Sequence, residues 1–569
     1  MARAAAAVLL IAIAFVSVET PSTALRAGAV PVRAKRGMVV SQESRASEIG
    51  AQALRDGGNA VDAAVATAFA LAVTHPAAGN IGGGGFLVYR PARGEPAAYD
   101  FRETAPARAS PSMFTVNGAY DAALHHNSHI AVGVPGTVAG LHLAWMRHGR
   151  LPWRRLVAPA IALARDGFVV SDGLARSLAA ALPAFRTHPA SLAQFSNAGI
   201  PYEAGDVLRQ RDLARTLERI ATRGPGGFYD GETAALVEQE MAAGGGLITR
   251  ADLRAYKAVE RAPIRGTYRG YEVIGMPPPS SGGIAVVQML NVLEGFDLAT
   301  SGHQAAATVH AIAESMRRAF ADRARHLGDP DFDPAMPIAR LISKDHAAAL
   351  RSTIRADRAS ASSPASFEWP RESRETTHLS VVDAARNAAA LTYTLEELYG
   401  SKIVVPGAGF LLNNEMGDFN AAPGLTDATG LIGTGPNLAQ PGKRMLSSMS
   451  PTILAKDGKV FMVTGTPGGR TIINTVLLTI LNVVDFGMNA QEAVDAPRFH
   501  HQWLPDRILY ERNGLSADTL SLLAGRGHQL SATERLGSAE VIVYNQMDDV
   551  LEGGVDRRAP DGAAGLVSK

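Results

Sequence analysis

The sequence predicts a layered α+β sandwich. Apolar residues recur with helical spacing through most of the chain before residue 355, whereas extended runs dominate after residue 376. Glycine-rich turns stand beside the expected strands, and no repeat of about 20–50 residues is visible. Because each helix or sheet must bury an apolar face against another element, this order favours helices layered on sheets.

The helix-rich part opens with a short strand at Met38. Two alanine-rich helical stretches follow up to residue 73; they are broken at Gly57-Gly58, and Pro76 ends the second one. The glycine run Gly82–Gly85 then precedes a strand over Phe86–Tyr89. Further on, the pattern predicts alternating helical segments over 155–250, a strand over 269–276, and helices over 134–148, 284–295 and 305–326.

The composition changes at residues 356–375, which are polar and charged, contain two prolines and predict an exposed, mobile segment. Strands are expected directly beyond it, over Leu379–Asp383 and Ala388–Leu395. A second strand pair is expected around 453–464, with the turn at Lys456-Asp457-Gly458. Gly465–Gly469 then leads into an apolar helix over 471–484.

Length and composition limit the possible functions. The chain has 569 residues, more than one compact core normally holds, so one large layered domain or two closely packed halves are expected. Its 55 Lys and Arg residues nearly balance 54 Asp and Glu residues, which argues against a nucleic-acid partner. There is no cysteine, so a thiol nucleophile, disulfides and cysteine metal sites are excluded.

The first 24 residues have the pattern of a signal peptide. Arg3 opens the segment, an apolar run covers Ala4–Val18, and Ser22-Thr23-Ala24 has the small-residue spacing of a signal-peptidase site. The alternative is a membrane anchor, but the apolar run is shorter than the ~20 residues that span a bilayer. We therefore expect a periplasmic or secreted chain with no membrane attachment after the signal is removed.

Several common catalytic signatures are absent. The sequence has no G-x-S-x-G, no H-E-x-x-H and no G-x-x-x-x-G-K-[ST] motif. Two histidine groups are candidate metal ligands, within 125–129 and at His500-His501. No second set of carboxylates or histidines at ligand spacing accompanies them, so neither a metal nor another cofactor is expected.

The segment Glu375–Asp383 places hydroxyl residues where the polar segment meets a strand. If the bond between Glu375 and Thr376 were cut, Thr376 would carry a nucleophile and a base in one residue, because its α-amine has a reference pKa of about 7.7–8.0. Its hydroxyl could also cut the precursor by an N→O acyl shift. Threonines are common at strand starts, so the segment alone favours an ordinary strand over a nucleophile.

Acyl chemistry also needs hydrogen-bond donors for the oxyanion. Gly468 and Gly469 lie in the turn Thr464–Arg470 between a predicted strand and a predicted helix. Two adjacent glycines can present backbone N–H groups without side-chain obstruction. A plain tight turn would have the same sequence.

Nine segments, taken together, resemble the γ-glutamyltransferase (γ-glutamyltranspeptidase) family and occur in the family's order from about residue 30 to the C-terminus. They are Asn80–Phe86, Asp100–Glu103, Gly133–Gly136, Pro278–Gly283, Thr376–Val382, Leu412–Met416, Leu446–Thr452, Gly465–Gly469 and Ala496–His501. The resemblance implies a four-layer αββα sandwich of the N-terminal-nucleophile hydrolase type. It also implies a precursor that cuts itself between Glu375 and Thr376 into a large subunit (25–375) and a small subunit (376–569), which stay together as a heterodimer.

The resemblance assigns a role to each site residue. Thr376 is the nucleophile, Thr394 hydrogen-bonds to it, and Gly468 and Gly469 form the oxyanion hole. The residues expected to bind the γ-glutamyl substrate are Arg102, Ser447 and Ser448 for the α-carboxylate, Glu415 and Asp418 for the α-ammonium, and in addition Glu396. Position 396 is Glu in animal members and Asn in several bacterial ones. Since the substrate is a zwitterion, the cation and hydroxyls are expected on one side and the acids on the other.

Two positions depart from the family pattern. Residue 417 is Gly where many members carry Asp, directly before Asp418. Residues 423–434 match the lid loop, yet they contain no aromatic residue, and Thr429 stands at the position of the usual tyrosine. Because a lid excludes water, this change bears on the balance between hydrolysis and transpeptidation.

The predicted activity is that of a γ-glutamyltransferase and glutathione hydrolase. Thr376 takes the γ-glutamyl group from glutathione or another γ-glutamyl compound and passes it to water, an amino acid or a peptide. One alternative is a cephalosporin (glutaryl) acylase of the same fold, whose substrate lacks the α-ammonium. The other is a catalytically inactive binding homologue.

Overall fold

The computed structural model of the chain describes residues 29–363, 376–425 and 433–568. The expected signal peptide (1–24), Glu375 and Thr429 lie outside these ranges. Within them, no helix is both long enough and apolar enough to cross a membrane.

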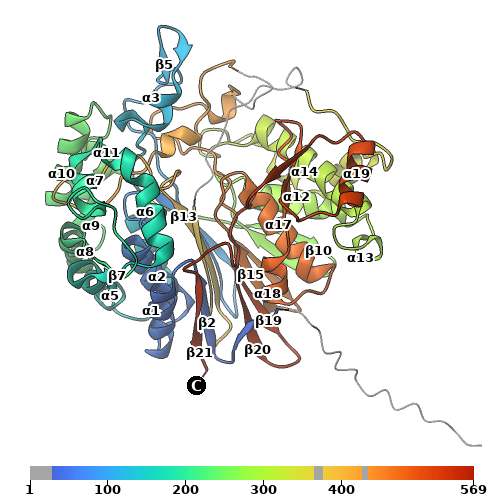
Figure 1. The fold of residues 1–569 in the computed structure, drawn as a ribbon, viewed down its shortest axis with the longest axis horizontal. Helices are drawn as coiled ribbons and strands as arrows, with labels where there is room; N and C mark the ends of the chain where they lie inside the picture. The colour runs from blue at the N-terminus through green and yellow to red at the C-terminus, as the bar shows by residue number, and fades with distance from the viewer. Residues whose placement is uncertain (1–28, 364–375, 426–432, 569) are drawn as a thin grey trace, which may run out of the picture.

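Two seven-stranded sheets stand face to face at the centre of the molecule (Figure 1). Neighbouring strands of the first sheet, called sheet I, are antiparallel throughout. In spatial order, sheet I contains β21 (Ala563–Val567), β2 (Gly37–Ser41), β12 (Thr377–Val382), β13 (Ala388–Thr394), β3 (Gly84–Arg90), β4 (Ala97–Phe101) and β9 (Val259–Arg261).

The second sheet, called sheet II, is also antiparallel throughout. Its strands, in spatial order, are β1 (Val32–Ala34), β20 (Val550–Val555), β19 (Glu540–Asn545), β15 (Lys459–Gly465), β14 (Thr452–Lys456), β11 (Tyr271–Gly275) and β10 (Ile264–Tyr268). Strands β12 and β13 of sheet I pack on β15, so the middle strands of the two sheets face each other.

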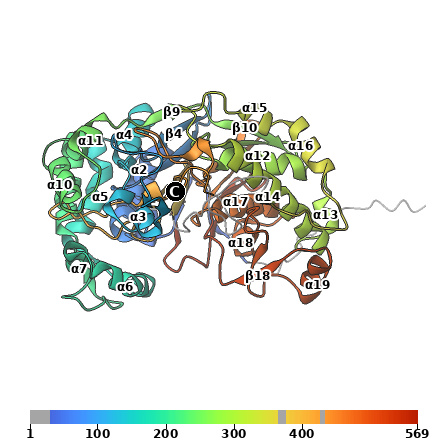
Figure 2. The ribbon, with the colours of Figure 1, turned by 90° about the horizontal axis from the view of Figure 1, so that it is seen from above.

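Helices cover the outer face of each sheet. On sheet I lie α1 (Ser44–Arg55), α2 (Ala60–Thr74) and α4 (Thr137–His148), with a further shell made of α5 (Trp153–Asp166), α6 (Asp172–Phe185), α7 (Pro189–Phe195), α8 (Arg211–Arg223), α9 (Gly226–Tyr229), α10 (Gly231–Ala243) and α11 (Arg250–Ala255). On the side of sheet II lie α12 (Gly282–Leu293), α13 (Leu298–Ser301), α14 (Ala306–His326), α15 (Ile338–Leu341), α16 (Lys344–Ser352), α17 (Thr471–Val484), α18 (Ala490–Asp495) and α19 (Ala517–Gly525). Seen from above, the two groups occupy opposite ends of the molecule (Figure 2).

Several short strands and helices lie outside the two large sheets and their helical layers. They are β5 (Thr115–Val116), β6 (Ala119–Tyr120), α3 (Ala122–His126), β7 (Phe168–Val169), β8 (Val207–Leu208), β16 (Phe499–His500), β17 (Ile508–Glu511), β18 (Leu530–Thr533) and the 3-10 helices η1 (His129–Ala131), η3 (Glu415–Asp418) and η4 (Gly435–Asn437).

Burial explains why the layers form. Every residue of α2 is buried, and the helix is nearly uncharged, so it can lie against sheet I. Asn59 caps its first turn in a capping box with Asp62. One apolar core fills the space between sheet I and its helices; a second core includes the inward side chains of both sheets and the helices on sheet II. The four layers of the predicted αββα sandwich are therefore confirmed.

The polar segment that the sequence predicts to be exposed is irregular and partly exposed in its described part, residues 356–363. Two of its backbone groups are nevertheless held by carboxylates. The backbone N–H of Ser360 donates to Glu314 Oε1 at 3.1 Å, and that of Ser362 donates to Asp506 Oδ2 at 2.7 Å. The buried Glu314 of α14 and the partly buried Asp506 thus tie this stretch to the rest of the protein.

Candidate active site

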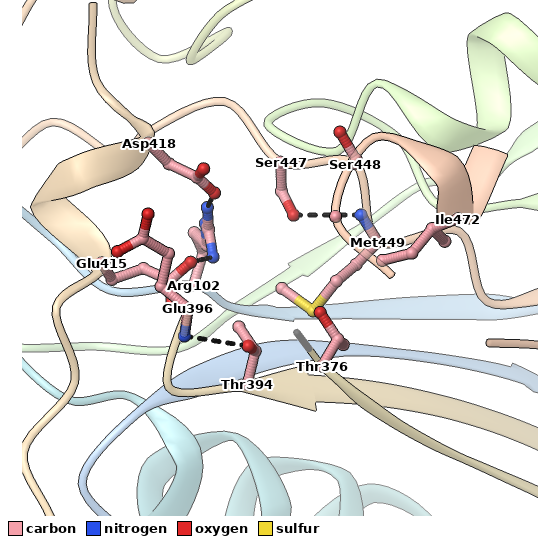
Figure 3. A pocket seen from close by; sticks show the side chains of 11 residues that line it. Arg102, Thr376, Thr394, Glu396, Glu415, Asp418, Ser447, Ser448, Met449 and Ile472 are labelled. Atoms are coloured by element: carbon pink, nitrogen blue, oxygen red, sulfur yellow. Dashed lines mark hydrogen bonds and ion pairs between the residues drawn. The ribbon is translucent and has the colours of Figure 1, made fainter. Parts of the chain in front are cut away.

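A small pocket opens where the middle strands of the two sheets end (Figure 3). Its lining comes from both sides of the predicted cleavage point. The lining residues are Arg102, Thr376, Thr394, Glu396, Glu415, Asp418, Ser447, Ser448, Met449, Gly469 and Ile472. Nine of them are among the ten residues that the sequence assigned to catalysis or substrate binding; Met449 and Ile472 add an apolar wall that it did not predict.

Thr376 lies directly before β12, which is an inner strand of sheet I. The register pairs Thr377 with Tyr393, and this pairing sets Thr376 opposite Thr394 at the end of β13. The Oγ1 of Thr394 accepts the backbone N–H of Glu396 at 2.9 Å, which fixes the hydroxyl at the turn (Figure 3). The structure thus brings the two threonines together, and their catalytic roles remain predictions.

A buried histidine stands behind Thr376 on the same face of β12. His378 Nδ1 lies 2.7 Å from Thr392 Oγ1, and His378 Nε2 lies 3.1 Å from Ser380 Oγ. Burial lowers the pKa of His378 to about 3, so the ring is neutral at physiological pH. We therefore interpret His378 as a support for the strand and not as a proton carrier.

The turn from β15 to α17 carries the two glycines predicted as oxyanion donors. Gly469 lines the pocket, while Gly468 lies one residue behind it. Both have positive φ angles, +133° at Gly468 and +55° at Gly469, which an L side chain rarely adopts. Their carbonyls accept the N–H groups of Thr471 (3.1 Å) and Ile472 (3.0 Å). No group in the described part of the chain accepts the N–H of either glycine, so both donors are available.

Arg102 is fully buried beyond the end of β4 and is held by acids. Its Nη1 pairs with Glu415 and its Nη2 with Asp418, while its Nε donates to the carbonyl of Met445 at 3.2 Å. Burial by itself lowers the pKa of Arg102, but the charges of Glu415 and Asp418 raise it by more, so the guanidinium stays protonated.

This arrangement corrects the expected division of charge. The sequence predicted the cation on one side of the pocket and the acids on the other, whereas Arg102 contacts two of the acids directly. A buried guanidinium is stable only beside opposite charge, which explains the pairing. Any further carboxylate that bound Arg102 would therefore compete with Glu415 and Asp418 for the same guanidinium.

Glu103 is a further buried acid, to which the sequence assigned no role although it follows Arg102 in a quoted motif. Its Oε2 lies 3.7 Å from Arg102 Nη1, and neither of its carboxylate oxygens has a hydrogen-bond partner in the described ranges. A Cβ on Gly84 would lie 2.5 Å from Glu103 Oε2, so the glycine run leaves room for the carboxyl. Burial, opposed by Arg102, raises the pKa of Glu103 to about 8, so this group is mostly protonated at pH 7.

Glu396 lines the pocket, and His126 of α3 lies beside it. His126 Nδ1 lies 3.3 Å from Glu396 Oε1. A Cβ on Gly417 would collide with that nitrogen and would lie 2.7 Å from both oxygens of Glu396. Burial and the neighbouring Asp418 raise the pKa of Glu396 well above its usual range, while burial lowers that of His126. The missing side chain at 417 is therefore what gives His126 access to Glu396.

Ser447 and Ser448 are buried on the opposite wall. The N–H of Ser281 donates to the carbonyl of Ser447 at 2.8 Å, and Ser447 Oγ accepts the N–H of Met449 at 3.2 Å (Figure 3). Behind them, the buried Arg323 of α14 donates from Nη2 to Ser448 Oγ at 3.1 Å and from Nε to Ser281 Oγ at 2.8 Å. The sequence did not reveal Arg323, because one arginine within a helix carries no motif.

The lid and the histidine candidates can be placed in part. Gly424 N donates to the carbonyl of Gly433 at 3.1 Å, so the two described ends of the lid segment meet.

The candidate metal-binding histidines contact other groups. His125 Nε2 lies 3.1 Å from the carbonyl of Met416, and His500 Nδ1 lies 2.7 Å from an amide nitrogen of Asn474. Across the described ranges, no group of three or more His, Cys, Asp or Glu side chains could hold a metal ion.

Comparison with known proteins identifies the family. The model of the γ-glutamyltranspeptidase family matches residues 46–566. The glutathione hydrolase proenzyme of Escherichia coli (strain K12) is 49% identical over 539 residues, which cover 93% of this chain and 92% of that protein. The acylase ACY 1 proenzyme of Pseudomonas sp. (strain SE83) is 37% identical over 551 residues, covering 95% of each chain.

Among solved structures, a cephalosporin acylase from Bacillus halodurans superimposes with a TM-score of 0.84 at 27% identity, covering 97% of this chain and 100% of that chain. The sandwich fold is thus shared with acylases. The family model, which spans nearly the whole chain, and the identity of almost one half to a glutathione hydrolase proenzyme agree with the resemblance found in the sequence motifs. The chain is a member of the γ-glutamyltranspeptidase family.

Proposed function

We propose that this protein is a self-processed γ-glutamyltransferase and glutathione hydrolase whose nucleophile is Thr376. The observation that carries the proposal is the meeting of Thr376, Gly469 and Arg102 in one pocket, although 274 residues separate Thr376 from Arg102 in the sequence (376 − 102 = 274). A nucleophile, an oxyanion donor and a carboxylate-binding cation are the three groups that γ-glutamyl transfer requires.

The first half of the reaction forms an ester. Thr376 Oγ attacks the γ-carbonyl carbon of the donor, and the free α-amine of Thr376 accepts the hydroxyl proton directly or through a water. The negative charge that develops on the carbonyl oxygen is stabilised by the N–H groups of Gly468 and Gly469. When the intermediate collapses, the C–N bond breaks, the amine returns its proton to the leaving nitrogen, and the γ-glutamyl group remains on Thr376.

The second half releases the acyl group. Water, an amino acid or a peptide attacks the ester carbon, the α-amine of Thr376 takes a proton from the attacking group, and the same two glycines stabilise the second oxyanion. The C–O bond then breaks and the proton returns to Thr376 Oγ. The products are glutamate when water attacks and a new γ-glutamyl amide when an amine attacks.

Donor recognition follows from the charges in the pocket. We propose that the α-carboxylate of the donor binds Arg102 and the hydroxyls of Ser447 and Ser448, in place of part of the contact between Arg102 and the acids. The α-ammonium then binds the carboxylates of Glu396, Glu415 and Asp418. Exchange of one carboxylate for another at Arg102 keeps the buried guanidinium paired throughout binding.

The proposal includes self-cleavage before Thr376. Thr376 Oγ attacks the carbonyl carbon of Glu375, the peptide bond gives way to an ester, and water hydrolyses that ester to leave a free amine on Thr376. The word "proenzyme" in the names of the two relatives supports a processed product. We also propose that residues 1–24 direct export to the periplasm or the medium.

Two measurements test the proposed function. N-terminal sequencing of the smaller fragment is expected to give Thr-Thr-His-Leu-Ser, and the purified protein is expected to release p-nitroaniline from γ-glutamyl-p-nitroanilide. A preparation that remains a single band on a denaturing gel contradicts the processing step, and a processed preparation without turnover contradicts the catalytic assignment.

A glutaryl acylase is the second candidate, because an acylase shares the fold along nearly the whole chain. Glutaryl groups lack the α-ammonium, so they leave Glu396, Glu415 and Asp418 without a cation to bind. We therefore expect γ-glutamyl-p-nitroanilide to react faster than glutaryl-p-nitroanilide; the reverse order favours the acylase.

A further inference from the structure

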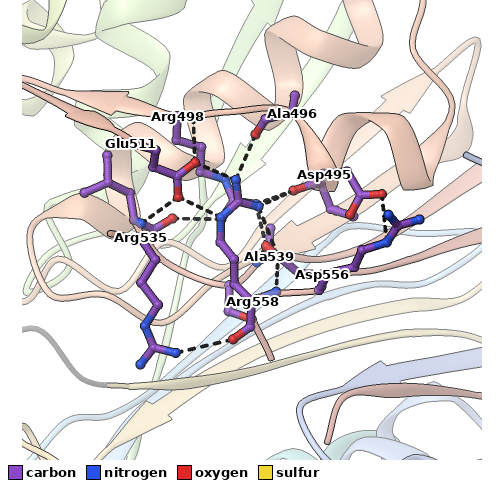
Figure 4. Close-up of polar contacts among 12 residues, drawn as sticks. Asp495, Ala496, Arg498, Glu511, Arg535, Ala539, Asp556 and Arg558 are labelled. Atoms are coloured by element: carbon purple, nitrogen blue, oxygen red, sulfur yellow. Dashed lines mark hydrogen bonds and ion pairs between the residues drawn. The ribbon is translucent and has the colours of Figure 1, made fainter. Parts of the chain in front are cut away.

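Four charged residues form a buried cluster behind the site, which we call the arginine cluster: Arg498, Glu511, Asp556 and Arg558 (Figure 4). Arg498 Nη2 pairs with Asp556 Oδ2 at 2.5 Å, and Arg558 Nη2 pairs with Glu511 Oε2 at 2.5 Å. Arg498 and Asp556 are 3% and 1% exposed, so their charges are balanced only within the cluster. Arg498 lies in a motif that the proposed function does not use, and it does not line the pocket.

The arginine cluster holds the backbone of one loop, residues 535–539, which joins β18 to β19. Leu536 N donates to Glu511 Oε1 at 2.8 Å, and Arg498 Nη1 donates to the carbonyl of Leu536 at 2.8 Å. Ala539 N donates to Asp556 Oδ2 at 2.7 Å. Three charged side chains therefore fix a short irregular segment by its main chain, independently of its side chains.

This loop lies directly against the turn that carries the two glycines. Ser538 N donates to Thr466 Oγ1 at 2.9 Å, and the same hydroxyl donates to the carbonyl of Pro467 at 2.8 Å. Gly537 has φ +65°, and a Cβ on it would lie 2.7 Å from Thr466 Oγ1 and 3.0 Å from the Pro467 carbonyl oxygen. A Cβ on Gly468 would in turn lie 3.4 Å from Gly537 Cα. No gap separates the loop from the turn.

We propose that Arg498, together with Glu511 and Asp556, is a positioning residue for the oxyanion-binding turn, acting through the loop 535–539. The proposal rests on the proposed function, since it assumes that Gly468 and Gly469 bind the oxyanion. Such donors must be held within about 0.5 Å of their working geometry. A fully satisfied buried polar network is rigid, so it can supply this constraint to a turn made of two conformationally free glycines.

A purely structural role for the arginine cluster predicts a different outcome. A variant that only weakens the fold lowers the melting temperature, and the folded fraction keeps normal kcat and KM. A variant that displaces the oxyanion donors lowers kcat while KM for the donor stays nearly constant, because substrate binding depends on Arg102 and the acids and not on the turn. The two roles can therefore be separated by kinetics.

The test replaces Arg498 with lysine in the full-length chain. Lysine keeps the charge but has one terminal nitrogen in place of the planar fork, whose Nη1 contacts the Leu536 carbonyl and whose Nη2 contacts Asp556, so it cannot reproduce this geometry. Since removal of one oxyanion donor typically lowers kcat about 100- to 1000-fold, partial displacement is expected to lower kcat at least about tenfold, with KM changed less than about twofold. Affinity for the boronic acid analogue of glutamate, which forms a tetrahedral adduct on Thr376, is expected to fall by the same factor. The matched control is Arg512→Lys, an exposed arginine that pairs with Glu534.

A second variant keeps the test decisive if Arg498→Lys does not fold. Gly537→Ala leaves the arginine cluster intact and inserts a methyl group between the loop and the turn, and it is expected to lower kcat with little change in KM. Gly487→Ala is its control, because Gly487 has a similar φ of +63° and no atom lies within 4 Å of the added Cβ.

The outcomes separate the two proposals. Absence of γ-glutamyl turnover in the wild type defeats the proposed function itself. Normal wild-type turnover, with unchanged kcat and unchanged boronate affinity in Arg498→Lys and in Gly537→Ala, overturns the positioning role alone.

Discussion

Arg323 donates a hydrogen bond to the hydroxyl of Ser448 at 3.1 Å, although the two residues are 125 positions apart in the sequence. The arginine is buried on α14, and its second bond, to Ser281 Oγ, ties the serine segment to the start of α12. This contact places a second guanidinium behind the hydroxyls that are proposed to bind the α-carboxylate of the donor.

Replacement of Arg323 is therefore expected to weaken donor binding. In Arg323→Met the side-chain volume is largely kept, while the hydrogen bonds to Ser448 and Ser281 are lost. KM for γ-glutamyl-p-nitroanilide is therefore expected to rise about tenfold, which corresponds to about 1.4 kcal/mol. The exposed Arg325 on the same helix provides the control variant, Arg325→Met. Equal KM values for the two variants would remove Arg323 from the binding site.

Thr376→Ala is expected to remain an uncut precursor, because the variant lacks the hydroxyl that attacks the preceding peptide bond. Thr394→Val is expected to be cut but to turn over at least about tenfold more slowly, since it keeps the shape of the side chain and loses one hydrogen bond beside the nucleophile. Denaturing gels and steady-state kinetics measure the two effects. A Thr376→Ala chain that still splits at the same bond contradicts self-cleavage by this residue.

Donor binding is expected to improve as pH rises. A carboxyl whose pKa is raised is protonated at low pH and ionises as pH increases, and only the ionised form attracts the α-ammonium. Because burial raises the pKa of Glu396, KM for the donor should fall as pH rises. Glu396→Gln should flatten this dependence, whereas Glu397→Gln, at the neighbouring and more exposed position, should keep it. A wild-type KM that does not vary with pH refutes the expectation.

Glu103 is expected to make stability depend on pH. Its folded pKa of about 8 lies above the reference value of 4.5, so the folded state binds the proton more tightly than the unfolded state. This contribution is complete below pH 4.5 and is lost as pH rises through 8. The melting temperature of the wild type should fall, relative to that of Glu103→Gln, as pH rises over that range. If the melting temperatures of the two proteins instead change with pH in the same way, Glu103 is ionised in the folded state.

Gly417→Asp introduces the residue that many family members carry at this position. Its side chain would collide with His126 and Glu396, so kcat/KM is expected to fall about tenfold, within the 1–3 kcal/mol typical of overpacking. The double variant Gly417→Asp/His126→Ala removes one of the colliding groups and should recover part of the activity. If the double variant is no better than the single one, His126 is not what restricts position 417.

The sequence predicted the elements that have strong hydrophobic periodicity or that end at glycine or proline. The apolar run over 471–484 matches α17. The break at Gly57-Gly58 separates α1 from α2, because alanine favours the helix and glycine interrupts it. The short strands β1, β9 and β10 were not predicted, since each contains few residues and owes its conformation to its neighbours in the sheet.

The site was predictable where residues belong to motifs and not where contacts alone define them. Thr376 and Arg102 stand in recognisable segments, and both line the pocket. Arg323 of α14 belongs to no motif, and His126 of α3 was considered only as a candidate metal ligand. Only the folded chain therefore reveals their contacts with Ser448 and Glu396. The pairing of Arg102 with acids was missed because sequence order contains no information on which charges meet across a buried pocket.

The position of β12 has a consequence for the processed protein. This strand lies between β2, from the first part of the chain, and β13, from the second, while β3 of the first part borders β13 on its far side. A cut before Thr376 leaves every one of these ladders intact, so the two polypeptides are interleaved and not merely docked. Dilution should not readily separate the folded pair, but unfolding releases two chains, so under reversible conditions the melting temperature of the cut protein should rise with protein concentration, whereas that of the uncut Thr376→Ala chain should not.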